Sequence, residues 1–322
     1  MTSPLPAQTV VPSDGDLPRA GGSPWKRWLT IITVAVVGYF LVRSIVSQWD
    51  AVSHYQWSLR WDWLLLSAAL VWIDFVVLIL LWRFILTRIG QHTMPFWTAY
   101  RVWFLSNFGK YLPGKVWTVM GMVVLLKAEG YSAAPVLVSA ILNQALSILS
   151  GLALSVIVLG AGTFGNIPVP VLAGIAVLLL AILYPPLLQW GINLGLRIIR
   201  RDPITISLPF GTIAGLFVAY LATWIAYGGA FWLLLLGIGI HPSGSFLQIV
   251  AIFAASYLIG FLALFVPGGL AVREGALSFL ITNWIPAGLA APVAVLSRIW
   301  LTVTELLGAV PLLWMRGSRD TT

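Results

Sequence analysis

Residues 111–115 read YLPGK and residues 265–269 read FVPGG, so two distant stretches of the chain carry the same proline–glycine break. Each break follows an apolar run and leads into a segment that carries charge. The sequence AAPV follows each break, at residues 133–136 and again at residues 290–293. Paired glycine and proline interruptions in two halves of a membrane protein point to a transport site. The pattern therefore predicts an internal repeat built on two broken helices.

The composition places the chain in a membrane. Hydrophobic residues make up 60% of the 322 residues, charged residues make up 9%, and the mean hydropathy is +0.96. Soluble domains carry about 25% charged residues, so one core could not hide this much apolar surface from water. The apolar runs are continuous and do not alternate, which excludes a β-barrel. We predict an all-α polytopic membrane protein with about eight transmembrane helices and two Pro-Gly-broken or re-entrant segments.

The remaining composition excludes several kinds of site. The chain has no cysteine, which removes disulfides, thiolate metal sites and cysteine nucleophiles. The three histidines, His54, His92 and His241, fall in expected loops and offer no buried metal cluster. The net charge is +8, but the basic residues are scattered at helix ends, which indicates cytoplasmic loops and anionic lipid. We expect no cofactor, no metal and no nucleic-acid partner.

The apolar segments divide the chain into three parts. Residues 1–24 contain five prolines and predict a disordered tail. Residues 25–316 form the membrane domain, and residues 317–322 form a short C-terminal tail. A membrane-spanning helix needs about 20 residues. Spans are expected near 29–47, 63–86, 133–159, 169–190, 212–237, 246–266 and 287–314, and the two broken segments at 97–127 and 268–284.

Lysine and arginine set the expected topology. Basic residues before the first span place the N-terminus in the cytoplasm. If 97–127 returns as a re-entrant hairpin, the cluster Arg197, Arg200 and Arg201 also lies inside. The C-terminal arginines prefer the inside only if 268–284 crosses as a short half-helix. The two halves then differ in topology, which a repeat does not explain.

Polar residues inside apolar segments are the first candidates for a site. A charge at the bilayer centre costs about 2.5–3.5 kcal/mol on insertion scales, so such residues usually face a partner or a cavity. Asp74 lies near the middle of the span 63–86. It either contributes to a binding site or forms an ion pair that holds helices together. Asn143 and Gln144 are expected to hydrogen-bond between helices.

The first break suits an anionic ligand. Gly114 opens a helix, and helix N-termini present unpaired N–H groups that favour negative charge. Lys110 and Lys115 flank the break, so they either contact a phosphate or extend to the cytoplasmic interface. Arg101 and Asn107 lie on the inbound arm and are expected to line the same cavity.

The second break has similar chemistry. Gly268 and Gly269 allow close backbone approach, and Arg273 offers a fork of donors for a phosphate. Glu274 either neutralises the empty site, or binds the cationic part of a zwitterionic head group. The alternative is a structural Arg–Glu pair elsewhere in the bundle.

The last helix adds a further pair. Arg298 and Glu305 are seven residues apart on one face, about 10 Å along the axis. They are too far apart to pair with each other, so each needs a different partner.

Two of these segments resemble the signatures of a known family. The sequence VPGGLAVREGAL at 266–277 resembles the Pro-Gly-Gly-Leu-Gly-x-x-Glu segment of the lysylphosphatidylglycerol synthase transmembrane-region family. Ala271 stands where that family usually has glycine. The sequence SNFGKYLPGKVW at 106–117 resembles its other signature, an Asn-to-Pro-Gly run ahead of a helix. Arg298 matches an arginine common in the family's final helix, whereas Glu305 falls outside the pattern.

The resemblance covers most of residues 28–314 and implies lipid handling in a bacterial or archaeal plasma membrane. The family is similar in layout to the flippase part of the bacterial multiple peptide resistance factor, which moves aminoacylated phosphatidylglycerol between leaflets. Relatives are linked to hopanoid and polyprenyl-linked glycolipid export. No soluble aminoacyl-transferase domain follows within the 322 residues, so we expect lipid handling and not an enzyme of lipid synthesis.

The leading interpretation is a flippase that moves a phospholipid or polyprenyl-linked lipid, with an anionic or zwitterionic head group in a charged intramembrane cavity. The alternatives are a membrane-embedded transferase, or a non-catalytic partner of a lipid-modifying enzyme or glycosyltransferase. No nucleotide-binding motif is present, so movement is expected to be downhill or ion-coupled. The oligomeric state is not assigned. The residues expected to bind the head group are Asp74, Arg101, Asn107, Lys110, Gly114, Lys115, Gly268, Gly269, Arg273, Glu274 and Arg298.

Overall fold

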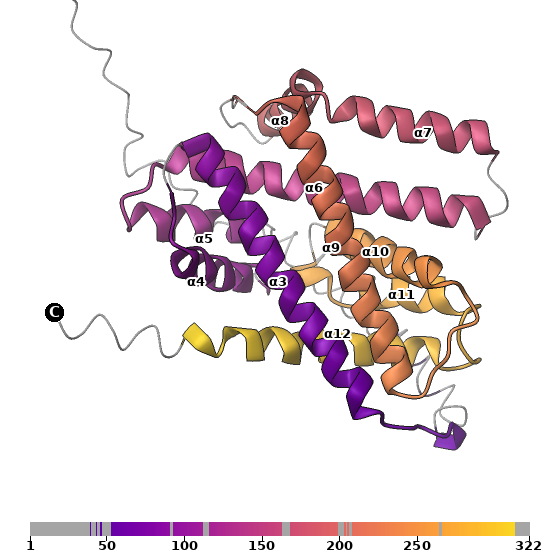
Figure 1. The fold of residues 1–322 in the computed structure, drawn as a ribbon. Coiled ribbons are helices and arrows are strands. Elements are labelled where there is room, and N and C mark those ends of the chain that lie inside the picture. Colours follow the sequence, from indigo (N-terminus) through magenta and orange to yellow (C-terminus); the bar gives the residue numbers. More distant parts are fainter. Residues whose placement is uncertain are drawn as a thin grey trace, which may run out of the picture.

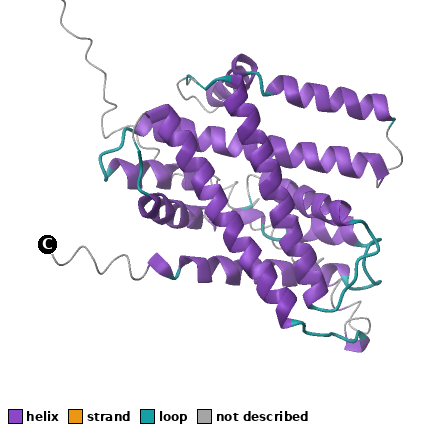
Figure 2. Cartoon of the chain, in the orientation of Figure 1, coloured by secondary structure: helices purple, strands orange, loops and turns teal. Residues whose placement is uncertain are grey.

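In the part of the chain that the computed structural model describes, helices are the only regular secondary structure, joined by loops and turns (Figure 2). The all-α prediction is confirmed for that part. The predicted tails and most of the span expected at 29–47 lie outside the described residues. Apart from a few isolated positions, the described ranges are 53–90, 93–111, 116–162, 168–198, 208–263 and 266–312.

Four of the described helices are long and apolar enough to cross a membrane. They coincide with predicted spans, because the prolines of these helices, Pro135 and Pro292, lie in the first turn, where proline is tolerated. The predicted total of eight stays a prediction. The four helices are α3 (Trp61–Gly90), α6 (Ala133–Gly162), α9 (Phe210–Gly237) and α12 (Ala290–Ala309).

Both broken segments consist of short helices around a 3₁₀ turn. A helix of 12 residues is about 18 Å long, which is well short of a hydrocarbon core of about 30 Å. The longest of these helices has 17 residues. The first segment contains α4 (Phe96–Asn107), η2 (Phe108–Tyr111) and α5 (Val116–Lys127), and the second contains α10 (Phe246–Leu262), η3 (Pro267–Gly269) and α11 (Val272–Ile281).

The backbone at the second break explains why the helix stops there. Gly268 and Gly269 have φ angles of 57° and 64°, a left-handed conformation that glycine adopts without steric cost. Ala271 also has a positive φ, 65°, and is the only described non-glycine residue that does. This position is strained for alanine.

Each broken segment folds back on itself as a hairpin. In the first, Arg101 of α4 forms an ion pair with Glu129, just beyond α5. In the second, the Ser243 amide before α10 donates to the Trp284 carbonyl after α11, over 2.8 Å. The predicted crossings at 246–266 and 268–284 are therefore two arms of one hairpin. Glycine allows this close return, because a Cβ on Gly260 would lie 2.6 Å from the Cβ of Arg273.

The two hairpins open at opposite ends of the bundle and their tips meet. Near the open end of the second, the Arg60 amide at the start of α3 donates to the Gly237 carbonyl, over 2.9 Å. At the other end of α3, a Cβ on Gly90 would lie 3.4 Å from Pro135, close to the end of the first hairpin. The turns η2 and η3 contact each other between these ends.

The element order of the two halves also agrees with the expected repeat. Each hairpin is followed by a long helix, and both long helices begin at an AAPV sequence, at Ala133 in α6 and Ala290 in α12. The two halves thus share the order helix, turn, helix, long helix.

The single span predicted at 169–190 is wrong. The segment forms two helices, α7 (Val169–Ile182) and α8 (Pro185–Ile198). Pro185 and Pro186 explain the break, because a proline disfavours helical geometry in the residue before it but suits the first turn of a new helix. In Figure 1, α7 lies alongside α6, whereas α8 is seen almost end-on.

The helices pack around a core that runs through the long pair α3 and α9. These two helices lie side by side and antiparallel (Figure 1). Small residues let them approach, since a Cβ on Gly237 would lie 2.6 Å from the Leu64 side chain. Close packing over small residues is the usual way in which membrane helices associate.

Candidate functional site

A polar cavity of about 250 Å³ lies where the two hairpins meet. Every described helix other than α7 and α8 contributes to its lining. Three cationic and two acidic side chains line it, so its formal charge is +1 if all are ionised. A cavity with excess positive charge favours an anionic ligand. The five side chains are Lys110, Arg273, Arg298, Asp74 and Glu305.

Lys110 at the tip of the first hairpin is held by Glu305 of α12. Its ammonium nitrogen lies 2.6 Å from both carboxylate oxygens. Asn107 donates a third hydrogen bond to the same carboxylate, over 2.7 Å. The Glu305 side chain is 8% exposed, so this ion pair is largely shielded from water. Glu305 therefore occupies the place at Lys110 that an anionic ligand would take.

Arg298 lies two turns before Glu305 on the same face of α12, and it is held by the second break. Its Nη1 donates to the Gly268 carbonyl over 3.1 Å. The same nitrogen lies 3.5 Å from Glu274 Oε1, which is within ion-pair range but forms no hydrogen bond. The expectation that Arg298 and Glu305 each need another partner is confirmed, and one helix thereby connects both breaks.

Arg273 is buried with an unused donor. The side chain is 6% exposed, and its Nη2 has no hydrogen-bond partner. Its guanidinium carbon lies 5.1 Å from the ring centroid of Phe253 and 5.0 Å from that of Tyr257. Such contacts contribute about 0.5–2 kcal/mol and orient the guanidinium without using its N–H groups. A buried donor left without a partner costs about 1–3 kcal/mol, which a bound anion would offset.

Asp74 adds an unused acceptor to the same cavity. It is 3% exposed on α3, and its Oδ1 has no hydrogen-bond partner. Both carboxylate oxygens of Glu274 also lack a hydrogen bond, although Glu274 does not line the cavity. The site thus presents an unused donor beside unused acceptors. An anionic group fits the first, and a cation or a proton fits the second.

Comparison with known families gives one match that covers most of the chain. Residues 27–308 match the family described as the lysylphosphatidylglycerol synthase TM region. The chain belongs to this family. Together with the four apolar helices, the match identifies the chain as an integral membrane protein of the lysylphosphatidylglycerol synthase TM region family. No curated protein shows a significant match to the chain.

The structure brings together six of the eleven residues expected to bind a head group. Glu274 lies behind them, against Arg298, and Gly269 packs on the Gly260 carbonyl. Arg101 does not line the cavity, because it pairs with Glu129 at the hairpin's open end. Gly114 and Lys115 lie outside the described residues. The six lining residues are Asp74, Asn107, Lys110, Gly268, Arg273 and Arg298.

Several lining residues were absent from the expected set. Glu305 is outside the family pattern recognised in the sequence, although its spacing from Arg298 places both on one face of α12. Asn143 accepts a hydrogen bond from Tyr220 of α9, which is the helix-to-helix contact expected of it, and it also lines the cavity. Tyr257 gave no signal in sequence, because an aromatic residue in an apolar run predicts packing. Among the described residues, no group of three histidines or acids could hold a metal.

Proposed function

We propose that this protein is a lipid flippase that binds a phosphate-bearing head group in the cavity between the two hairpins. The unused Nη2 of buried Arg273 is the observation that carries the proposal. Guanidinium groups match phosphate oxygens with paired donors, which favours a phosphate over a simple anion. The acyl or prenyl tails remain in the bilayer, since the cavity is too small to hold them.

Glu305 acts in this proposal as a stand-in for the substrate. Its carboxylate satisfies Lys110 and Asn107 when the cavity is empty. An arriving phosphate binds Arg273 first and then displaces Glu305 from Lys110. The exchange of one anion for another keeps Lys110 paired throughout, which avoids the cost of an isolated ammonium group in low dielectric.

The two hairpins supply access from both leaflets. We infer that each is re-entrant, because its two open ends lie together at one end of the bundle. With the N-terminus in the cytoplasm and α7 crossing back beside α6, this topology also places the C-terminus in the cytoplasm without a crossing at 268–284. Movement of one hairpin tip against the other then opens the cavity to one leaflet at a time.

The proposal is tested by leaflet exchange in liposomes that contain the purified protein. Fluorescent phosphatidylglycerol, aminoacylated phosphatidylglycerol, a polyprenyl phosphate and a neutral glycolipid are incorporated separately. A membrane-impermeant quencher then reports the fraction of each lipid that reaches the outer leaflet. Protein-free liposomes provide the spontaneous rate.

The proposal predicts protein-dependent exchange of at least one phosphate-bearing lipid and none of the neutral lipid. Equal exchange of all four lipids would indicate a nonselective defect in the bilayer. No exchange of any lipid by a folded protein would contradict transport, and would favour a partner or a transferase.

A further inference from the structure

Helix α8 has an outward apolar face and an inward face that anchors it. Leu187, Trp190 and Leu194 recur at helical spacing on the outward face, and Trp190 is 65% exposed. Leu188 points the other way, is 3% exposed, and belongs to the same core cluster as Ile85 of α3. The helix is therefore fixed to the bundle along one side while a second apolar side has no protein partner among the described residues.

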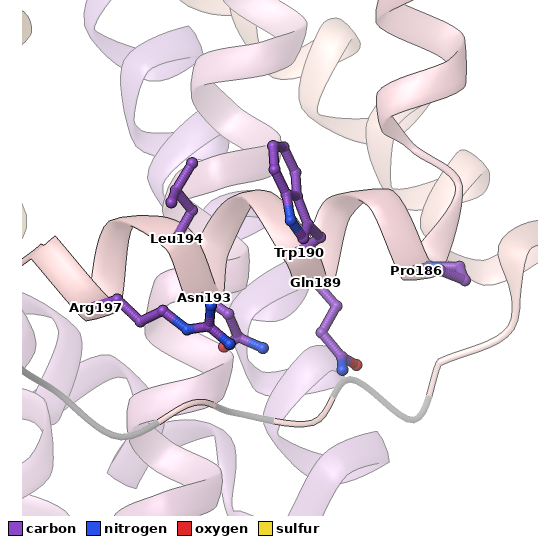
Figure 3. Close-up of a pocket in the computed structure, with 6 residues that line it drawn as sticks. All are labelled: Pro186, Gln189, Trp190, Asn193, Leu194 and Arg197. Atoms are coloured by element: carbon purple, nitrogen blue, oxygen red, sulfur yellow. The ribbon is translucent and has the colours of Figure 1, made fainter.

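The third face of α8 is polar. Gln189, Asn193 and Arg197 follow one another at four-residue intervals, which places them in one stripe. Figure 3 shows these three side chains on one side of α8 and Trp190 and Leu194 on the opposite side. An open hollow of about 240 Å³ borders α8, and it is lined by the polar stripe together with Pro186, Trp190 and Leu194.

The direction of α8 separates it from the spanning helices. It is seen almost end-on in Figure 1 and runs across the helices behind it in Figure 3. Ile85, which shares that core cluster with Leu188, lies five residues from the C-terminal end of α3, which is about 8 Å along that helix. Arg88 in the last turn of α3 lies at this same end. The helix thus lies across the bundle at the level of its basic end.

We propose that α8 is an interfacial helix whose polar stripe binds anionic phospholipid head groups, while its apolar face rests among the acyl chains. Arg197 is the only charged residue from 133 to 198, and Arg200 and Arg201 follow it in the sequence. This charge selects an anionic leaflet over an apolar protein partner. A helix with separate apolar and cationic faces lies in the plane of the bilayer surface. The inference does not depend on flippase activity.

The absence of cysteine from the chain allows a direct depth measurement. Single cysteines replace Leu187, Leu194 or Asn193 in the full chain, and each carries a nitroxide in phosphatidylcholine vesicles with phosphatidylglycerol. Oxygen and a water-soluble nickel chelate then report depth by spin relaxation. Labels at Leu65 and Ile73, both lipid-exposed on α3, provide the spanning reference, since eight helical residues correspond to about 12 Å.

The proposal predicts equal depth at Leu187 and Leu194 with strong oxygen access, and stronger nickel access at Asn193. A steady change in depth of about 1.5 Å per residue would show that α8 spans the membrane. Protection of Leu187 and Leu194 from both reagents would show a protein partner instead. Either result overturns the proposal.

The head-group preference is tested by omitting phosphatidylglycerol and by the substitution Arg197→Gln. The label at Asn193 should become more mobile when the anionic lipid is removed, and Arg197→Gln should abolish that difference. If the mobility of the Asn193 label does not depend on lipid charge in the protein that keeps Arg197, anionic head-group binding is contradicted. The label at Leu187 checks in both variants that α8 remains folded on the bundle.

Discussion

At the scale of single residues, three cations meet at the cavity and each is held differently. Lys110 has a carboxylate partner, Arg298 has the Gly268 carbonyl, and Arg273 has two aromatic rings and an unused donor. The difference follows from geometry, because aromatic faces orient a guanidinium without occupying its N–H groups. Arg273 is therefore the cation best prepared for a new anion.

The stand-in role of Glu305 makes a first prediction. Glu305→Gln should lower the melting temperature of the lipid-free protein in detergent, because Lys110 loses its buried counter-ion at a cost of about 1–3 kcal/mol. Added anionic phospholipid should restore more of the melting temperature than it adds to the unsubstituted protein. Asp62→Asn, which breaks an exposed pair with Arg60, should change neither value. A Glu305→Gln variant that ignores anionic lipid would contradict the stand-in role.

The backbone at Ala271 makes a second prediction. Its φ of 65° is unfavourable for alanine and suits glycine, so Ala271→Gly should stabilise the protein by about 1 kcal/mol. Thermal unfolding in detergent measures the effect. Ala276→Gly, in the regular part of α11, should instead destabilise by about 1 kcal/mol. Equal effects at both positions would show that the turn is not strained.

Sequence could predict which residues carry charge into the membrane, but not which of them pair. Arg273 and Glu274 are neighbours, yet one faces aromatic rings and the other faces Arg298. Successive helical side chains point about 100° apart, so neighbours usually meet different helices. Arg101 and Asn107 were expected together, but their separation along α4 places only Asn107 at the cavity.

At the scale of helices, the breaks were visible in sequence and the folding back was not. The Pro-Gly pairs marked both turns, because proline and glycine interrupt helices through local geometry. The return of α11 along α10 depends instead on Gly260. Because glycine has no side chain, the aliphatic part of Arg273 can pack directly against the backbone there. The break between the two helices in 169–190 also has a local signal, Pro185 and Pro186, but the continuous apolar run favoured a single span.

The hairpin packing makes a third prediction. Gly260→Ala should force α10 and α11 apart, destabilise the protein by about 1–3 kcal/mol and slow lipid exchange by displacing Arg273. Gly215→Ala in α9, where a Cβ would meet nothing within 4 Å, should be neutral or slightly stabilising. Thermal melting and liposome exchange are measured on both variants. Normal lipid exchange by Gly260→Ala would contradict the prediction that transport depends on the position of Arg273.

At the scale of the whole molecule, the re-entrant topology proposed for the two hairpins removes the inconsistency that the sequence left. The sequence required a crossing at 268–284 to keep the C-terminal arginines inside. The structure pairs Ser243 with Trp284 across the open end of the second hairpin, so the two halves are alike. Long-range contacts of this kind have no local signal, which is why the element order was predictable and the arrangement was not.

This arrangement makes a fourth prediction. Single cysteines at Ala128 and Ser243, both exposed, mark the open ends of the first and second hairpin. In intact cells, a membrane-impermeant maleimide should label Ser243→Cys directly and Ala128→Cys only after permeabilisation. The chain has no cysteine of its own, so there is no background within the protein. Labelling of both positions from the same side would contradict the opposed hairpins.

The proposed binding of the head group by Arg273 during transport is tested by comparing variants of this residue. Exchange of a phosphate-bearing lipid in liposomes is measured for the unsubstituted protein and for Arg273→Ala, Arg273→Lys and the exposed control Arg60→Ala. The account predicts at least a tenfold loss for Arg273→Ala, partial activity for Arg273→Lys and no change for Arg60→Ala, since a charge-assisted hydrogen bond contributes about 1.5–3 kcal/mol. Undiminished exchange by a folded Arg273→Ala protein would contradict it.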